Sequence, residues 1–201
     1  MGYCDYWKTS SDADKYYHDN EWGVPLHDDR KHFEFLTLES MQCGLSWKTI
    51  INKREIFKKC FADYDYDKVA KFTYKDIDRI MNTGGMIKAV RKIKAIIHNA
   101  QCFNKIRDEF GTFSDYIWKF SDRKTILYDG HDTGSIPASN ALSETVSKDL
   151  KKRGFKFVGA VTIYSYLQSV GIINDHDKDC PRYDYINSNF PTVHKRRHGE
   201  K

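Results

Sequence analysis

Four residues toward the two ends of the sequence carry side chains that commonly bind transition metals. Cys4 and His18 lie near the N-terminus, and His176 and Cys180 stand in His-x-x-x-Cys spacing near the C-terminus. Two thiolates and two imidazoles would fill a tetrahedral zinc shell and leave no position for water, so such a site would be structural. Because the two pairs are far apart in the sequence, spacing alone leaves a second interpretation open, in which these are ordinary core or surface side chains.

A second group of residues combines aromatic rings with one carboxylate. Tyr16, Tyr17 and Trp22 fall in one segment, and Glu39 and Trp47 fall in the next. Glu39 stands in an otherwise apolar stretch, where a carboxylate is either exposed or buried for a functional reason. Rings beside such a carboxylate can bind a flat cationic ligand by stacking and cation–π attraction. The alternative is that the tryptophans are core anchors and Glu39 is a surface residue.

Two basic segments have the composition of phosphate-binding elements. A Gly-Gly pair at 84–85 precedes a basic helix, so its backbone N–H groups could point at an anion. The segment 147–156 carries five basic residues in ten. Both features have an ordinary alternative, because glycines commonly end helices and charged runs commonly face solvent. The residues expected to contact phosphate are Gly84, Gly85, Lys88, Lys92, Lys152 and Arg153.

Helices are the elements expected to position these groups. Apolar residues recur at helical spacing over 86–100 and more briefly over 77–81. Asp28 or Asp29 and Ser139 are suitable N-caps for two further helices, and the run 157–170 reads as a buried helix. No stretch shows sustained period-two alternation, so the sequence predicts an all-α fold without a sheet. We expect one helical unit of two interlocked lobes over residues 1–180, followed by a mobile, polar and basic tail at 181–201.

Composition narrows the class of protein. The 201 residues form one large domain or two small interlocked ones. The excess of 33 basic over 28 acidic residues gives a net charge of +5, which favours a polyanionic partner without proving one. No apolar run approaches the roughly 18 residues of a membrane span, and the start lacks a secretory signal pattern, so we expect a cytoplasmic protein. The five cysteines include no Cys-x-x-Cys pair, which argues against disulfides in that compartment.

Five blocks of this sequence, in order, resemble the 3-methyladenine DNA glycosylase I family. Together they extend over most of residues 4–180, and they are Tyr17–Pro25, Leu38–Glu39, Gly44–Trp47, Lys151–Gly159 and Gly171–Cys180. The resemblance implies a helix-hairpin-helix glycosylase fold with 84–87 in the DNA-binding hairpin. It also implies a structural Zn²⁺ bound by Cys4, His18, His176 and Cys180. The implied reaction is hydrolysis of the N-glycosidic bond of 3-methyladenine in alkylated double-stranded DNA, the first step of base excision repair.

The implied chemistry assigns roles to the aromatic and acidic residues. A base inside a duplex must be flipped into a pocket before it can be cleaved. Because N3-methylation makes the base a cation and a good leaving group, recognition matters more than acid catalysis. Glu39 would accept a hydrogen bond from the exocyclic amine and complement the cation, and it could also position the attacking water. Trp47 and Tyr17 would stack on the base, while three more rings would line or support the pocket: Trp22, Trp7 and Tyr16.

The resemblance has departures. Asp14 stands where family members usually carry a tyrosine, which puts one pocket wall in doubt. The Cys4–His18 spacing is one residue longer than expected, so either Tyr6 or Trp7 could take the place of the family tryptophan. Residues 88–90 are less arginine-like than expected, and the tail after Pro181 matches no family element.

Two rival functions follow from the same residues. A catalytically inactive zinc-stapled DNA-binding protein would not need the pocket carboxylate, so the presence of Glu39 counts against it. A zinc hydrolase needs an open coordination position, which four protein ligands do not leave. The favoured expectation is a monomeric glycosylase in the cytoplasm, associated with the nucleoid while it scans DNA, and with no membrane partner.

Overall fold

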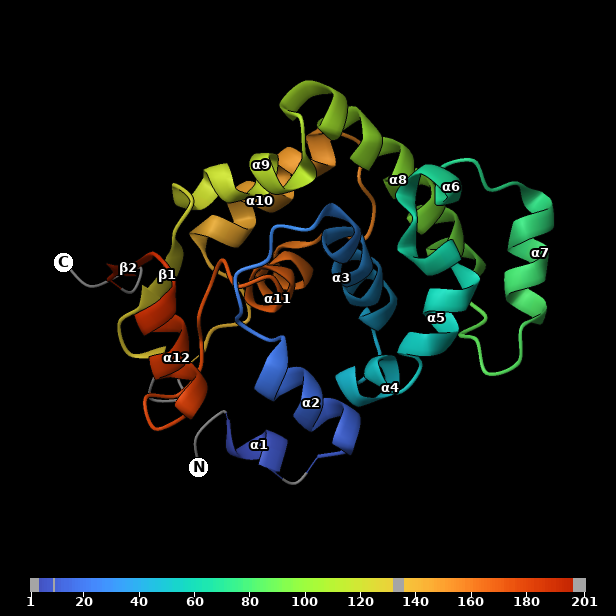
Figure 1. Cartoon of the computed structure of the whole chain (residues 1–201). Coiled ribbons are helices and arrows are strands. Elements are labelled where there is room, and N and C mark those ends of the chain that lie inside the picture. The colour runs from blue at the N-terminus through green and yellow to red at the C-terminus, as the bar shows by residue number, and fades with distance from the viewer. Residues whose placement is uncertain (1–3, 9, 132–135, 197–201) are drawn as a thin grey trace.

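The computed structural model describes residues 4–8, 10–131 and 136–196, and helices make up most of them (Figure 1). The helices of the first half are α1 (Asp5–Lys8), α2 (Asp12–Asn20), α3 (Asp29–Gln42), α4 (Trp47–Ile51), α5 (Arg54–Cys60), η1 (Ala62–Tyr64), α6 (Tyr66–Val69) and α7 (Tyr74–Asn82). Those of the second half are α8 (Val90–Phe110), α9 (Phe113–Trp118), η2 (Lys119–Ser121), α10 (Ala141–Lys152), α11 (Ala160–Ser169) and α12 (Pro181–Asn189). Two short strands, β1 (Thr125–Tyr128) and β2 (Thr192–Lys195), complete the described elements.

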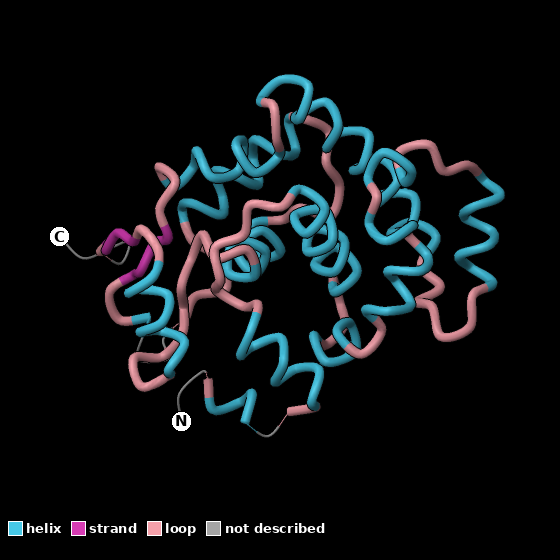
Figure 2. Tube along the Cα trace, in the orientation of Figure 1, coloured by secondary structure: helices cyan, strands magenta, loops and turns pink. Residues whose placement is uncertain are grey.

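Helices α3 and α11 form the centre of the molecule. They pack against each other, and the other helices surround them (Figures 1 and 2). Every residue of α3 from 32 to 41 is buried. Half of these ten buried residues are polar or charged, and a buried charged side chain needs a specific environment. Glu39 lies on this buried part of α3.

Capping side chains explain where several helices begin. Asp28 accepts a hydrogen bond from the N–H of Lys31 at the start of α3, as the sequence predicted. The cap of α10 is Asn140, one residue after the predicted Ser139, because Asn140 forms a reciprocal capping box with Ser143. The predicted helices over 77–81, 86–100 and 157–170 are confirmed as α7, α8 and α11 with shifted ends.

The expectation that the fold contains no sheet is wrong. Strands β1 and β2 pair in parallel, with Thr125 opposite Thr192 and Tyr128 opposite Lys195. Each strand has only four residues, and the first three residues of β1 are buried, so β1 shows no alternation of apolar and polar residues. The pairing joins segments that are more than 60 positions apart, which local periodicity cannot reveal.

The expectation of a mobile tail is also corrected for residues 181–196. Residues 181–189 form α12, with a proline in its first turn, and 192–195 form β2. Ile186 is fully buried, and its side chain packs close to Gly23. The N–H of Thr125 donates to the carbonyl of Pro191, which fixes the chain between the two elements. Residues 197–201, which belong to the same expected tail, lie outside the described residues.

Within the described parts of the chain, no helix combines the length and the apolar character required to cross a bilayer.

Candidate functional site

A cavity of about 310 Å³ opens between the central helices and the N-terminal ones. Its walls come from α1, α2, α3, α4 and α11, so segments far apart in the sequence meet around it. Mixed aromatic and polar walls in a cavity of this size are typical of small-molecule sites. The lining residues are Trp7, Tyr17, Trp22, Glu39, Gln42, Trp47, Ser165 and Gln168.

Glu39 supplies the carboxylate of the cavity. It is only 3% exposed, and burial raises its pKa to about 8. Its Oε2 accepts no hydrogen bond within the described part of the chain. A buried polar atom without a partner is costly, and such atoms are concentrated at functional sites. The carboxyl group is therefore available to a donor or a positive charge on a bound ligand.

Aromatic rings surround the carboxyl group. The ring centroids of Tyr17 and Trp47 lie 5.0 Å apart with 42° between their planes, and those of Trp7 and Tyr17 lie 5.9 Å apart. Trp7 also contacts Trp22, at 6.1 Å between ring centroids. These are four of the five rings predicted for the pocket, and the structure brings all four to the cavity wall. Faces of aromatic rings near a carboxylate fit a flat, electron-poor ligand.

Tyr16 was predicted for the pocket, and Asp14 put one of its walls in doubt; the structure places both outside the cavity lining. Tyr16 is 61% exposed and does not line the cavity, because it points outward from α2. Asp14 is fully buried, and its Oδ2 accepts a 2.7 Å hydrogen bond from the hydroxyl of Ser11. It is not a cavity residue either, and Trp7 provides the wall on the side of α1. The alternative residue for that wall, Tyr6, has a side chain outside the described ones.

Three polar cavity residues were not predicted as site residues. Gln42 lies close to one turn after Glu39, which was the available signal for it. Ser165 and Gln168 lie three positions apart on α11 and therefore share one face of that helix. No feature of the sequence indicates these two, because α11 reads as an apolar helix on nearly every side.

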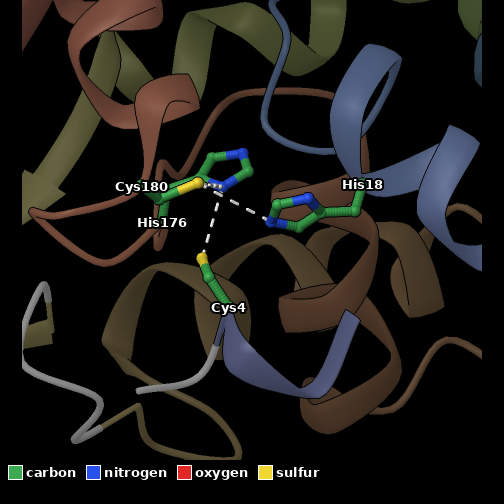
Figure 3. A group of neighbouring side chains, drawn as sticks. All are labelled: Cys4, His18, His176 and Cys180. Atoms are coloured by element: carbon green, nitrogen blue, oxygen red, sulfur yellow. Dashed lines mark hydrogen bonds between the residues drawn. The ribbon is translucent and has the colours of Figure 1, made fainter. Parts of the chain in front are cut away.

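The four predicted metal ligands converge next to Trp7 and Trp22, which also line the cavity. Cys4, His18, His176 and Cys180 are all buried, and their ligand atoms lie within 4.8 Å of one another (Figure 3). The Nδ1 of His176 is 3.6 Å from the sulfur of Cys4 and 3.5 Å from that of Cys180, and the Nε2 of His18 is 3.8 Å from the sulfur of Cys180. A tetrahedral zinc shell has nitrogen–sulfur edges of about 3.6 Å, so the four side chains fit Zn²⁺.

Hydrogen bonds behind the cluster orient its histidines. The Nδ1 of His18 is 2.8 Å from the carboxylate of Asp19, and the Nε2 of His176 is 3.0 Å from the carbonyl of Trp22. These contacts leave the other ring nitrogen of each histidine facing the sulfurs, as metal ligation requires. Trp22 thus connects the cluster to the cavity, because its backbone supports a ligand while its ring lines the wall.

The backbone around the cysteines supports the same arrangement. The N–H of Cys4 donates to Asp177 at 2.6 Å, and the N–H of Asp177 donates to the sulfur of Cys4 at 3.3 Å. The pKa of Cys180 is lowered, above all because the Cys4 thiol donates a hydrogen bond to its sulfur. The donor set therefore fits a closed, structural metal centre that joins the two ends of the described chain.

The residues predicted to contact phosphate are not gathered in one place. Gly84 and Gly85 lie exposed in the turn between α7 and α8, with exposed Lys88 close behind. Gly85 has φ +77, and an added Cβ would come within 2.8 Å of Ile56. Only a glycine fits that turn without strain. Lys92 points inward, where its Nζ donates to the carbonyls of residues 41 and 43 at 2.7 and 2.6 Å.

The second basic segment lies at the far end of α8. Arg153 binds Glu109 near the C-terminal end of α8 at 2.6 Å, whereas Gly84 and Gly85 precede its first residue. With 21 residues in α8, these ends are about 30 Å apart. Arg153 also binds Asp149 at 2.8 Å, so its guanidinium is already engaged, whereas Lys152 is exposed.

Comparison with known proteins agrees with this geometry. The sequence pattern of the methyladenine glycosylase family matches residues 7–183. The chain belongs to this family. Family membership covers all eight cavity residues and three of the four cluster residues, since only Cys4 precedes the matched segment. The match ends within α12, so β2 lies beyond it.

Individual members of the family are similar over most of their length. DNA-3-methyladenine glycosylase of Haemophilus influenzae is 44% identical over 165 residues, which are 82% of this chain and 89% of that protein. DNA-3-methyladenine glycosylase 1 of Escherichia coli is 42% identical over 167 residues, or 83% of this chain and 89% of that protein. A solved structure of a variant of 3-methyladenine DNA glycosylase I in complex with 3-methyladenine superposes with a TM-score of 0.85 at 37% identity, covering 90% of this chain and 97% of that one.

Proposed function

We propose that this chain is a DNA glycosylase that removes 3-methyladenine from alkylated double-stranded DNA and leaves an abasic site. The observation that carries this proposal is the buried carboxyl group of Glu39, which accepts no hydrogen bond at Oε2 in the described chain and faces a cavity walled by aromatic rings. A flipped purine has the flat shape that such walls accept, and a methylated purine has the positive charge that a carboxylate complements. The names of the similar proteins support the same substrate.

The reaction needs little acid catalysis. In the nucleotide, N3-methylation gives the base a positive charge, so the electrons of the breaking C1′–N9 bond return to the base and neutralise it. Water adds its oxygen to C1′ and loses one proton. Glu39 stabilises the cationic base in the cavity, and Trp47 and Tyr17 stack on it. Because these contacts exist only for a flipped base, they offset the cost of unstacking it.

The metal centre has a structural part in this proposal. Cys4, His18, His176 and Cys180 would hold Zn²⁺, and a closed shell would supply rigidity rather than a reactive water. Trp22 and Trp7 lie between the cluster and the cavity, with ring centroids 6.0 and 5.5 Å from that of His18. Fixing the cluster therefore fixes two cavity walls.

Contact with DNA is assigned to the turn between α7 and α8, in a helix-hairpin-helix arrangement. Its backbone at Gly84 and Gly85 is exposed, as is Lys88. The chain, acting as a monomer, would bind the phosphates of double-stranded DNA there through backbone N–H groups and lysine charge.

The experiment that tests the function is release of free base from alkylated duplex DNA by the zinc-loaded protein. Release of 3-methyladenine is expected from the wild type and should fall about ten- to hundredfold in Glu39→Gln, since hydrogen bonds to charged groups are worth about 1.5–3 kcal/mol. Glu144→Gln is the matched control, because Glu144 is exposed on α10 and should release base at the wild-type rate.

Two other outcomes have distinct meanings. Release that survives Glu39→Gln would preserve the function and assign recognition of the cation to another group. No release from a folded, zinc-loaded wild type would contradict the glycosylase proposal and favour a catalytically inactive zinc-stapled DNA-binding protein.

A further inference from the structure

Gln168 is a cavity residue whose backbone is fixed from two sides. Its carbonyl accepts hydrogen bonds from the N–H of Gly23 at 3.0 Å and from the N–H of Gly171 at 3.2 Å. Gly23 directly follows Trp22, another cavity residue, so the two walls are joined through this contact. The side chain of Gln168 is 5% exposed and therefore has little freedom to move.

A buried carboxylate fixes the orientation of the Gln168 side-chain amide. The Nε2 of Gln168 donates to Oδ2 of Asp175 at 2.8 Å. The hydroxyl of Tyr164 donates to the same oxygen at 2.6 Å, and the ring of His131 lies 2.8 Å from Oδ1. Carboxylate oxygens accept hydrogen bonds, so the amide must present its NH₂ group to Asp175. The reverse orientation would place two acceptors against each other.

The carbonyl oxygen of the same amide, Oε1, has no partner among the described residues. Unlike Oε2 of Glu39, this oxygen is not fully buried. Because Gln168 lines the cavity and its NH₂ group is held by Asp175, we infer that Oε1 faces the cavity.

We propose that Gln168 is a specificity-determining residue that selects a base with an exocyclic amine over one with an oxo group at the same position. This inference rests on the proposed function and names the chemical feature that the pocket reads. The Glu39 carboxylate and the Gln168 carbonyl both offer acceptors, and the hydrogen bond to Asp175 prevents the Gln168 amide from exchanging the positions of its oxygen and its NH₂ group. Ser165 and Gln42 do not impose this selection, because a hydroxyl or an unanchored amide can rotate to donate or accept.

The physical basis is the cost of an unmatched acceptor. An amine satisfies the Gln168 carbonyl, whereas an oxo group would leave two acceptors facing each other in a buried site. Sites that hydrogen-bond a ligand NH group reject analogues without it far better than apolar sites reject a change in size. The selection would therefore favour an adenine-type lesion over a guanine- or hypoxanthine-type lesion.

The test compares two free bases that differ at this one position, 3-methyladenine and 3-methylhypoxanthine, by calorimetric titration of the zinc-loaded protein. The wild type should bind the amine at least about tenfold more tightly. Gln168→Met keeps the length of the side chain and removes the fixed acceptor, so it should reduce this preference about tenfold. Gln101→Met is the matched control, because Gln101 is exposed on α8 and lies outside the cavity, so its replacement should leave the preference unchanged.

The outcomes separate this proposal from the proposed function. A wild type that binds 3-methyladenine but shows the same preference as Gln168→Met overturns the role of Gln168 and keeps the base pocket. An equal loss of preference in Gln101→Met also overturns it. A wild type that binds neither base contradicts the base pocket and this proposal together. If Gln168→Met does not fold, the wild type alone still decides, since a preference for the oxo base overturns the proposal.

Discussion

Glu39 is a carboxylic acid held in an environment that disfavours its charge. Burial raises its pKa to about 8, so at neutral pH the free protein carries it largely protonated. If the carboxylate is the form that binds the cationic base, kcat/KM should rise with pH up to about 8 and then level off, because kcat/KM reports the free enzyme. The measurement is base release from 3-methyladenine-containing duplex at subsaturating DNA between pH 5.5 and 9.

The control for this pH profile is Glu39→Gln, which has no proton to lose. Its residual release should be flat across the rising part of the wild-type profile. A wild-type rate that falls as the pH rises toward 8 would mean that the protonated acid is the active form and that Glu39 donates rather than accepts.

The sequence predicted the residues whose chemistry is unusual for their surroundings. Glu39 stands out among apolar neighbours such as Leu38 and Met41, and the cysteine and histidine pairs stand out by residue type, so the sequence alone identifies all of them. Gln168 was not, because its function depends on Asp175, which approaches from outside α11. The orientation of an amide depends on its three-dimensional partners and leaves no trace in local composition.

At the level of elements, Lys92 shows why charge alone misassigns a residue. It was predicted to bind phosphate, yet its Nζ donates to the carbonyls of Met41 and Cys43 at the end of α3. The last carbonyls of a helix lack intrahelical partners and carry partial negative charge, so a lysine there acts as a C-terminal cap. This cap connects α8 to the end of α3 that carries Glu39.

Lys92→Met should therefore act through stability. Two carbonyls lose a charged donor, which should lower the free energy of unfolding by about 1–3 kcal/mol, measured by urea denaturation. Lys88→Met is the matched control on the exposed side, where loss of charge should weaken DNA binding and reduce its salt dependence while leaving stability unchanged. The cap would be disproved if Lys92→Met kept wild-type stability and showed the DNA-binding defect of the control.

Helices were easier to predict than strands for a related reason. The periodicity of 77–81 and 86–100 is local, and it identified α7 and α8. β1 and β2 owe their pairing to each other and to the segment after α11, where the N–H of Ile126 donates to the carbonyl of Ile172. Such contacts stabilise four-residue strands that would not form alone, so the sequence around either strand could not predict them.

Across the whole molecule, the two ends of the described chain would depend on a metal ion in the Cys/His cluster to different degrees. The C-terminal side is also held by backbone contacts, because the N–H of Asn174 donates to the carbonyl of Ile126 and β2 pairs with β1. The N-terminal side consists of the four-residue α1, which is too short to be stable by itself. Since Trp7 on α1 lines the cavity, the cluster should matter most for keeping this wall in place.

Removal of zinc should therefore destabilise the N-terminal helices more than the C-terminal segment. The protein is expected to carry one Zn²⁺, and Cys180→Ala should lose it, lower the melting temperature and reduce base release, because metal-binding energy contributes to folding. Hydrogen exchange of the metal-free protein should show protection lost in α1 and α2 and retained in β1 and β2. Cys43→Ala, a half-buried cysteine outside the cluster, should keep both metal and protection. Unchanged metal content in Cys180→Ala, or equal loss of protection at both ends, would show that the cluster does not anchor α1 and α2 as argued.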